Sequence, residues 1–237
     1  MLAYRQNMAK VCVIVGMGRG IGLSVARRFG SEGYKLALLA RGEKSLLDYA
    51  GALEFDGIKA LTYTADASRP PTVLSAIRAA EKELGPVGVL IYNAAASKPA
   101  KPSELKVEEL EATQRVNLGG ALVAAQAALP SMLRRKAGTM LFTGGGLALR
   151  PSAQAAALSI GKASLRALVG TLSQELALEG IHVATVTVAG MVKRGTEFDP
   201  DLIAEKFWEL HSQPREKWQV EVVFDGKETA VQASSHP

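Results

Sequence analysis

The chain has 237 residues, of which 48% are hydrophobic and 22% charged, a composition typical of a folded globular protein and not of a disordered one. Its single cysteine, Cys12, excludes a disulfide framework and a cysteine-rich zinc site, and the three histidines lack ligand spacing, so we expect no metal. The net charge of +5 is not gathered in a long basic run and only 5% of residues are aromatic, which argues against nucleic-acid binding. No apolar run approaches the ~20 residues that cross a bilayer. We therefore expect a cytoplasmic protein that binds neither nucleic acid nor a membrane.

Short apolar runs rich in β-branched residues alternate with longer segments of helical spacing along the whole chain. The predicted strands are 10–15, 35–40, 59–64, 87–92, 139–143, 182–188 and 220–224, and the predicted helices are 21–30, 46–53, 73–84, 107–133, 158–178 and 200–210. Near-continuous apolar strands are typical of a parallel sheet covered by helices on both faces. The alternation predicts one α/β domain over residues 1–237, a Rossmann-like doubly wound parallel sheet of about seven strands flanked by helices. Residues 1–8 are interpreted as a dispensable N-terminal extension and residues 227–237 as a mobile polar tail.

A glycine-rich turn, G-M-G-R-G-I-G over residues 16–22, follows the first predicted strand and leads into the first predicted helix. Glycine lets the backbone approach a pyrophosphate, and the free N–H groups and dipole of a helix N-terminus favour the anion. This context predicts a dinucleotide site, whereas an isolated glycine cluster would indicate only a turn. The residues expected to contact the dinucleotide here are Gly16, Gly18, Arg19, Gly20, Ile21 and Gly22.

The spacing of Gly16, Gly20 and Gly22 is G-x-x-x-G-x-G, which resembles the short-chain dehydrogenase/reductase family. The G-x-G-x-x-G of other Rossmann enzymes would need glycine where Ile21 stands. The likeness extends in order and spacing to about residue 192. It implies adenine contacts at Asp66 and Ala67, cofactor contacts at Asn93, Ala94, Gly190 and Val192, and a catalytic role for Asn117, with Tyr92, Ala95 and Ala189 departing from the usual family residues.

The end of the second predicted strand decides between NAD and NADP. An acidic residue there would bind the ribose 2′-hydroxyl and repel a 2′-phosphate. Ala40 takes that place, Arg41 follows, and Arg19 can approach from the glycine turn. Two guanidinium groups without a nearby carboxylate favour NADP(H) over NAD(H); the alternative is that Arg41 is only a solvated charge.

The catalytic signature departs from the family, whose members carry Tyr-x-x-x-Lys and a serine thirteen residues before the tyrosine. Lys162 lies 45 residues after Asn117, as the family spacing requires, but Leu158 and Gly145 occupy the tyrosine and serine positions. In the family the tyrosine protonates the alkoxide that hydride attack leaves, the lysine lowers its pKa and binds the nicotinamide ribose, and the serine polarises the carbonyl. Lys162 and Asn117 are therefore the expected remaining catalytic residues. Other donors, each with an ordinary structural alternative, would be Tyr92, Thr143, Ser152, Gln154 and Ser159, and the glycines 144–146 form either an anion nest or a flexible turn.

Residues 193–224 correspond to the substrate loop and C-terminal region of the family. Their aromatic residues either line a hydrophobic pocket or anchor a C-terminal element against a partner subunit, and the spacing around Phe207 is simply that of a helix face. The resemblance implies a small-molecule substrate and a homodimer or homotetramer. Three functions remain open: an NADP(H)-dependent oxidoreductase acting on a small carbonyl or activated double bond with atypical proton delivery, an inactive NADP(H)-binding sensor or partner subunit, and a non-redox enzyme that reuses the pocket.

Overall fold

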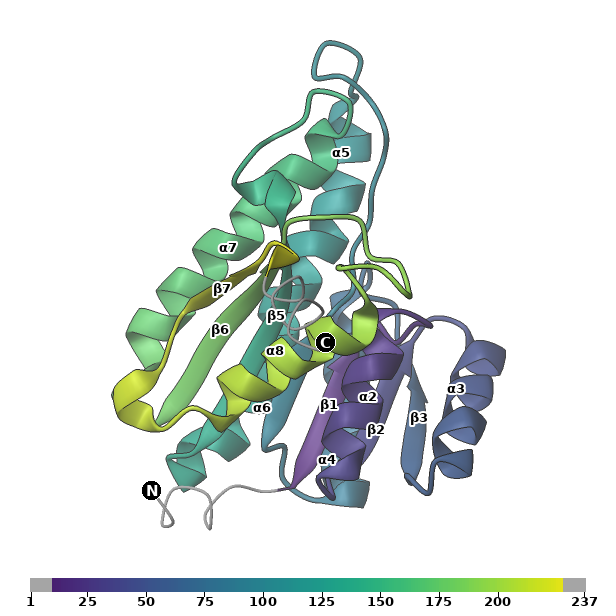
Figure 1. Cartoon of the computed structure of the whole chain (residues 1–237), viewed down its shortest axis with the longest axis vertical. Coiled ribbons are helices and arrows are strands. Elements are labelled where there is room, and N and C mark those ends of the chain that lie inside the picture. The colour runs from purple at the N-terminus through teal and green to yellow at the C-terminus, as the bar shows by residue number, and fades with distance from the viewer. Residues whose placement is uncertain (1–9, 228–237) are drawn as a thin grey trace, which may run out of the picture.

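Residues 10–227 are described by a computed structural model of the chain (Figure 1). They form one parallel sheet of seven strands in the order β3-β2-β1-β4-β5-β6-β7. The strands are β1 (Val11–Val15), β2 (Lys35–Ala40), β3 (Ala60–Thr64), β4 (Val89–Tyr92), β5 (Gly138–Gly145), β6 (Ile181–Val188) and β7 (Glu221–Phe224). The predicted doubly wound α/β fold is confirmed. The expected N-terminal extension, 1–8, and all of the expected tail except residue 227 lie outside the described residues.

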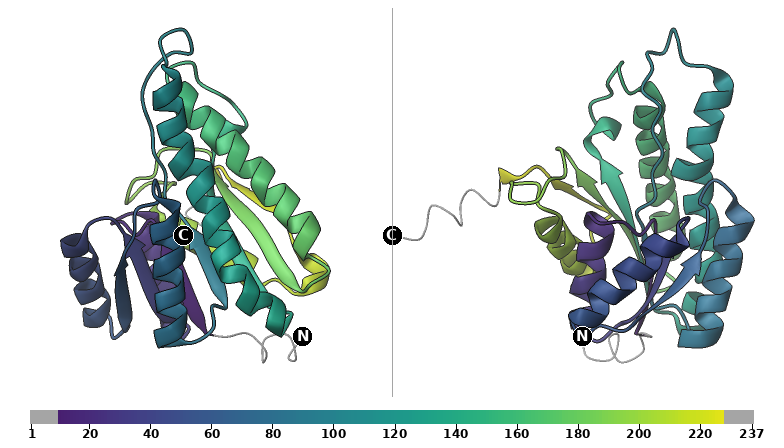
Figure 2. Two further views of the ribbon diagram at one scale, coloured as in Figure 1. Left: turned by 180° about the vertical axis from the view of Figure 1, so that it is seen from behind. Right: turned by 90° about the vertical axis from the view of Figure 1, so that its right-hand side faces the viewer.

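Helices cover both faces of the sheet (Figures 1 and 2). On one face lie α2 (Ile21–Ser31), α3 (Glu43–Phe55) and α8 (Pro200–Ser212), and on the other lie α4 (Pro70–Leu84), α6 (Ala121–Arg135) and α7 (Ala156–Leu176). Successive strand residues enter opposite layers: Val13 and Val15 pack in one core, Cys12 and Ile14 in the other. This is why the strands are apolar at nearly every position.

The strand order reverses beside β1. From β1 the chain builds outward through β2 and β3, and then returns to place β4 on the other side of β1. In open α/β sheets such a switch point leaves a crevice at the carboxyl ends of the strands, because the connecting segments depart in opposite directions. The fold therefore places a ligand crevice at the ends of β1 and β4.

The predicted helix 107–133 is interrupted. The structure divides it into α5 (Val107–Gln114), a π-helical segment, η1 (Arg115–Gly120), and α6. Regular α-helical spacing gives no hint of this segment, because its neighbours on both sides are helical too. In Figure 1, α5 and the loop before it extend beyond the sheet, next to the first turns of α7.

The helical stretch Val107–Arg135 also corrects an expectation about membranes. It is long and apolar enough to cross a bilayer, judged by length and composition alone, although the sequence predicted no such stretch. Half of its most apolar window is buried inside the protein, where α6 packs against α4, β4 and β5. Packing in the core explains the apolar composition of that buried half.

The C-terminal aromatic residues belong to the packing of the fold. Phe207 of α8 is fully buried in the core, as its helical spacing indicated. Trp208 lies edge-on to Phe29 of α2, and Trp218, after the short helix η3 (Arg215–Lys217), stacks flat on His182 with ring centroids 4.8 Å apart. None of these rings lines the crevice at the ends of β1 and β4. Their contacts within the chain hold the C-terminal region to the sheet, and anchoring against a partner subunit stays a prediction.

Candidate cofactor and active site

A cavity of about 790 Å³ opens at the carboxyl ends of β1, β2, β3 and β4. Six of the residues predicted to bind the dinucleotide line it: Gly16, Arg41, Asp66, Ala67, Asn93 and Ala94. A volume of this size suits a ligand larger than a single substrate of a few carbon atoms. The other predicted cofactor residues are Gly18, Arg19, Gly20, Ile21, Gly22, Lys162, Gly190 and Val192, and they lie outside this lining.

The glycine turn is built differently at each glycine. Gly16 has a φ of +87° and a Cβ there would lie 2.3 Å from the Ala94 nitrogen, so no other residue fits without movement. At Gly18 and Gly20, by contrast, an added Cβ would meet nothing within 4 Å. Gly16 is therefore required by the fold itself, whereas Gly18 and Gly20 border open space at the N-terminus of α2. No side chain caps that helix and its first turn holds no acidic residue, which suits an anion.

A chain of hydrogen bonds connects the glycine turn to Lys162. The amide of Asn93 donates to the Gly16 carbonyl at 2.9 Å and accepts from the Thr143 hydroxyl at 2.8 Å. The Lys162 ammonium donates to the Thr143 carbonyl at 2.6 Å. The Asn93 side chain thus ties the ends of β1, β4 and β5 together and positions the glycine turn. Asn93 also borders the cavity.

The electrostatics at the ends of β2 and β3 differ from the sequence prediction. Arg41 is exposed on the cavity wall as expected, but the carboxylate of Asp66 lies near enough for the Arg41 charge to help lower the pKa of Asp66. Hydrogen bonds from the backbone and side chain of Ser68 contribute most to that lowering. The prediction that no carboxylate is near was wrong because β2 pairs with β3, which brings residues 41 and 66 to the same edge. Arg19 is exposed and does not line the cavity.

Two residues on the first turns of α3 complete the wall beside Arg41. Ser45 and Tyr49 both line the cavity, four residues apart on one face of the helix. The sequence argument missed them because it followed motifs at strand ends. The i, i+4 spacing just after the strand-end arginine was the available signal.

Asn117 lies in the π-helical segment and is almost completely buried. Its side chain accepts a hydrogen bond from the Ala96 nitrogen at 2.8 Å and donates to the Ala96 carbonyl at 2.9 Å. It also packs on Gly161 of α7, where a Cβ would lie 2.5 Å from its amide nitrogen. In this geometry Asn117 fastens the loop after β4, which borders the cavity, to the helix that carries Lys162.

Lys162 is held against the end of β5. Its aliphatic stem lies over Gly145, where an added Cβ would be 3.4 Å from Cε and from Cγ. Burial lowers the pKa of Lys162 to about 8, and no neighbouring charge contributes to this shift. Leu158, one helical turn earlier in α7, is partly buried. Neither Gly145 nor Leu158 therefore offers a hydroxyl group to Lys162.

The hydroxyl groups proposed as other proton donors have structural partners. Tyr92 is fully buried, its hydroxyl donates to the Val116 carbonyl, and burial raises its pKa far above the ordinary value. Ser159 donates to the Ala155 carbonyl and accepts from the Ser152 nitrogen. Thr143 is committed to Asn93, and Gln154 is exposed at the end of the loop before α7.

The glycines 144–146 form neither a nest nor a flexible turn. Gly144 and Gly145 continue β5 and pair with β6, and Gly146 begins a 3₁₀ turn, η2 (Gly146–Ala148). The position of a Gly144 Cβ is filled by the hydroxyls of Thr185 and Thr187. Gly144 is therefore set by packing against β6.

The loop after β6 is short and tied down. The ring of Phe198 lies against Gly190, the Lys193 nitrogen donates to the Phe198 carbonyl at 3.2 Å, and Asp199 accepts from the Gly195 nitrogen at 2.6 Å. Val192 is exposed and does not reach the cavity. The loop is thus braced by its own contacts, and no cluster of three metal-ligating side chains occurs in the part of the chain that the structure describes.

Comparison with known proteins identifies the class of protein that this fold and site define. The sequence profile of the short chain dehydrogenase family matches residues 10–204, and the chain belongs to that family. It is 30% identical over 183 residues to an uncharacterized oxidoreductase of Staphylococcus aureus strain USA300, covering 77% of this chain and 78% of that protein. It is 29% identical to the human 3-oxoacyl-[acyl-carrier-protein] reductase over 84% of this chain and 81% of that protein. A metagenomic short-chain oxidoreductase, solved in complex with NADP, superimposes with a TM-score of 0.83 at 25% identity, over 92% of this chain and 97% of that one.

Proposed function

We propose that the protein is an NADP(H)-dependent oxidoreductase that reduces a small carbonyl compound or an activated double bond. The observation that carries the proposal is the hydrogen-bonded chain from Gly16 through Asn93 and Thr143 to Lys162. It fixes the glycine turn that would hold the pyrophosphate at a set distance from the lysine that would hold the nicotinamide ribose. A site that only bound a nucleotide would not need to fix the lysine at the nicotinamide end relative to the glycine turn at the pyrophosphate.

The residues present fit a nicotinamide dinucleotide. Gly18 and Gly20 leave room for phosphate oxygens at the N-terminus of α2, and Asp66 borders the cavity where the adenine would lie. Arg41 supplies the positive charge that a ribose 2′-phosphate requires. When bound, the reduced nicotinamide would supply a hydride to the substrate. The solved relative that binds NADP supports the same assignment.

We further propose that Leu158 and Gly145 stand where other members of the family carry the catalytic tyrosine and serine. Leu158 lies one turn before Lys162 in α7, and Gly145 lies under the Lys162 stem at the end of β5. Neither side chain can donate a proton or polarise a carbonyl. Proton delivery is then atypical, and substrates whose carbonyl or double bond is already activated suit this site best.

A second function, that of a catalytically inactive NADP(H) sensor or partner subunit, is favoured by one observation. The hydroxyls of Tyr92, Thr143 and Ser159 already have protein partners, so each would have to give one up to act on a substrate. A sensor would bind NADPH as the enzyme does but would consume none with any carbonyl compound.

The cofactor assignment is tested by calorimetric titration with NADPH and NADH. We expect NADPH to bind more tightly than NADH. Arg41→Ala should lower the affinity for NADPH at least about tenfold and leave the affinity for NADH nearly unchanged, because only NADPH carries the 2′-phosphate that the arginine would contact. Arg69→Ala is the matched control, since Arg69 also acts on the pKa of Asp66 but does not line the cavity. Equal affinities for both cofactors, together with a silent Arg41→Ala, would refute the assignment.

We also propose that the protein works in the cytoplasm as a homodimer or homotetramer. Its only cysteine, Cys12, is fully buried in β1 and needs no oxidising compartment. Large apolar side chains on the helices and just beyond them remain exposed, among them Val107 of α5, Ile160 of α7 and Leu178 in the turn after α7. Such positions are where a second copy of the chain would cover apolar surface.

A further inference from the structure

We propose that the ammonium group of Lys162 is itself the proton donor of the reaction. The inference rests on the proposed reductase function and names the residue that would complete it. It assigns to the lysine a proton transfer to substrate, in addition to holding a ribose. Three features of the structure lead to it.

The first feature is that the two positions beside the lysine stem, Gly145 and Leu158, carry no hydroxyl group. Gly145 has an extended backbone, with φ −164° and ψ 146°, yet carries no side chain, and the Lys162 stem lies directly over it. Leu158 offers only methyl groups one turn away. A substrate oxygen that enters between these two positions meets no hydroxyl from them. The nearest group of this cluster that can release a proton is the lysine ammonium.

The second feature is that nearby hydroxyls are committed elsewhere. Thr143 donates to Asn93, Ser159 donates to the Ala155 carbonyl, and the buried Tyr92 hydroxyl donates to the Val116 carbonyl. Each would have to break a structural hydrogen bond to act on a substrate. Lys162 has three N–H bonds, and within residues 10–227 its ammonium donates to one acceptor, the Thr143 carbonyl, so donors remain for a ribose and a substrate.

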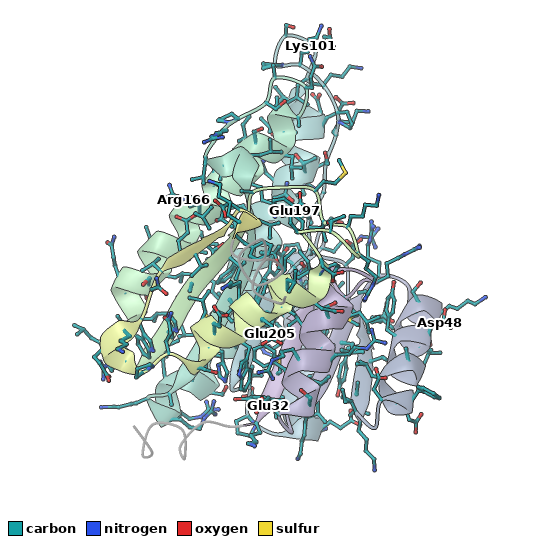
Figure 3. The ribbon with its side chains drawn as sticks, viewed as in Figure 1. Glu32, Asp48, Lys101, Arg166, Glu197 and Glu205 are labelled. Carbon is teal, nitrogen blue, oxygen red and sulfur yellow. The ribbon has the colours of Figure 1, made fainter. Side chains whose placement is uncertain are left out.

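The third feature is the uncharged surroundings of the ammonium. Thr143 of β5 accepts from the ammonium and Gly145 of β5 lies under the stem, while Asn117 of the π-helical segment packs on Gly161, the residue before the lysine. On α7 itself, Arg166, which is labelled in Figure 3, lies one turn further on. It is paired with Glu221. Burial in this apolar setting lowers the pKa of Lys162 to about 8, close to the pH at which an acid donates and regains protons most effectively.

The proposed step balances as follows. Hydride from the reduced nicotinamide cofactor forms a C–H bond at the carbonyl carbon, and the π-electron pair of the C=O bond moves to oxygen. An N–H bond of the Lys162 ammonium breaks as the O–H bond of the alcohol forms. The cofactor is left oxidised and Lys162 is left as a neutral amine, which regains its proton from solvent. The reverse reaction uses the neutral amine as base.

One test needs no turnover. Protein labelled with ¹³C at the lysine Cε is titrated by NMR, and Lys162→Met identifies the Lys162 resonance. We expect that resonance to titrate with a midpoint near 8, well below the 10.5 of an unperturbed lysine. A Lys162 resonance that titrates with the exposed lysines would overturn the inference.

The second test measures single-turnover hydride transfer to diacetyl at saturating NADPH. For the wild type we expect a rate constant that is constant below about pH 8 and falls about tenfold per unit above it, because the acid must be protonated. Lys162→Met should lose about 10²–10⁴ in rate, and Lys162→Arg, which keeps the charge but holds its proton, should lose the break near pH 8. Lys82→Met, on the outer side of α4, is the control and should match the wild type. NADPH titration of each variant shows whether the site is intact.

The outcomes separate the two proposals. Hydride transfer that keeps its rate and its break near pH 8 in Lys162→Arg would overturn the role of the lysine and leave the reductase function in place. A wild type that binds NADPH yet transfers hydride to no ketone, quinone or diketone would overturn the reductase function, and the lysine proposal with it. A ribose-binding role alone would change NADPH affinity without moving the pH profile.

Discussion

Introducing the two hydroxyls that we propose the site lacks is the most demanding test of that proposal. The variant Gly145→Ser/Leu158→Tyr places them beside an existing lysine. At residue 145 the backbone is extended, and the new Cβ would lie 3.4 Å from the flexible Lys162 stem, an ordinary contact. Replacing a strand glycine removes backbone freedom worth about 0.5–1 kcal/mol, so the serine should cost no stability. Residue 158 is one turn before Lys162 on the same helix face, which brings a phenol within reach of the ammonium.

With ordinary ketones, which the lysine alone is expected to serve poorly, the gain should approach that of a general acid, about 10²–10⁴ in the rate of reduction at saturating NADPH. The assay follows NADPH consumption with simple ketones, quinones and diketones, and calorimetry measures NADPH affinity in parallel. The matched control is Gly145→Ala/Leu158→Phe, which adds nearly the same carbon atoms without the hydroxyls. We expect this control to stay at the wild-type rate with ordinary ketones, which is slow or undetectable.

Three results would refute this reasoning. A control that gains as much as the serine and tyrosine variant would show that filling space, not proton donation, was the deficit. A hydroxyl variant that binds NADPH normally but reduces no probe would show that the site no longer admits carbonyl substrates in that pose, and would favour the sensor. Fast ketone reduction by the wild type would show that the missing hydroxyls were never limiting.

The remaining predictions concern the glycine turn, the lysine and the assembly. In urea unfolding, Gly16→Ala should destabilise the fold by roughly 2–4 kcal/mol, because the φ of residue 16 is +87° and the new Cβ would meet the Ala94 backbone. Gly18→Ala should change the stability by less than about 0.5 kcal/mol, because its Cβ would meet nothing within 4 Å, but it should weaken NADPH binding at least about tenfold. Folding lowers the pKa of Lys162, so between about pH 8 and 10.5 the unfolded chain binds more protons than the folded chain. The free energy of unfolding of the wild type should therefore rise with pH across that window by about 1–3 kcal/mol. Lys162→Met should not show this rise. Light scattering at micromolar concentration should give two or four times the mass of one chain, and a monomer mass would refute the homo-oligomer.

The strands and their order of appearance were predictable because a parallel sheet buried on both faces requires apolar residues at almost every strand position. Val11–Val15 and Ile181–Val188 illustrate this, since every residue in both strands is buried. The glycine turn was predictable for a similar reason, because Gly16 occupies a conformation that other residues rarely adopt.

What sequence reasoning missed depends on neighbours distant in the chain. The carboxylate beside Arg41 comes from Asp66 on the adjacent strand, and the role of Thr143 depends on Asn93, fifty residues earlier. Such pairs follow from strand pairing and not from local pattern. The π-helical segment around Asn117 was missed because the periodicity of a window cannot show one extra residue per turn.

That extra residue has a consequence for how this protein can evolve. A π segment shifts the phase of everything that follows it, so α5 and α6 present their faces independently although they form one continuous rod. α6 must keep its face toward the sheet to hold the core, whereas α5 extends past the sheet beside α7. Substitutions in α5 can therefore change the surface beside α7 without any compensating change in α6. Selection can alter that surface at one end of the rod while stability is kept at the other.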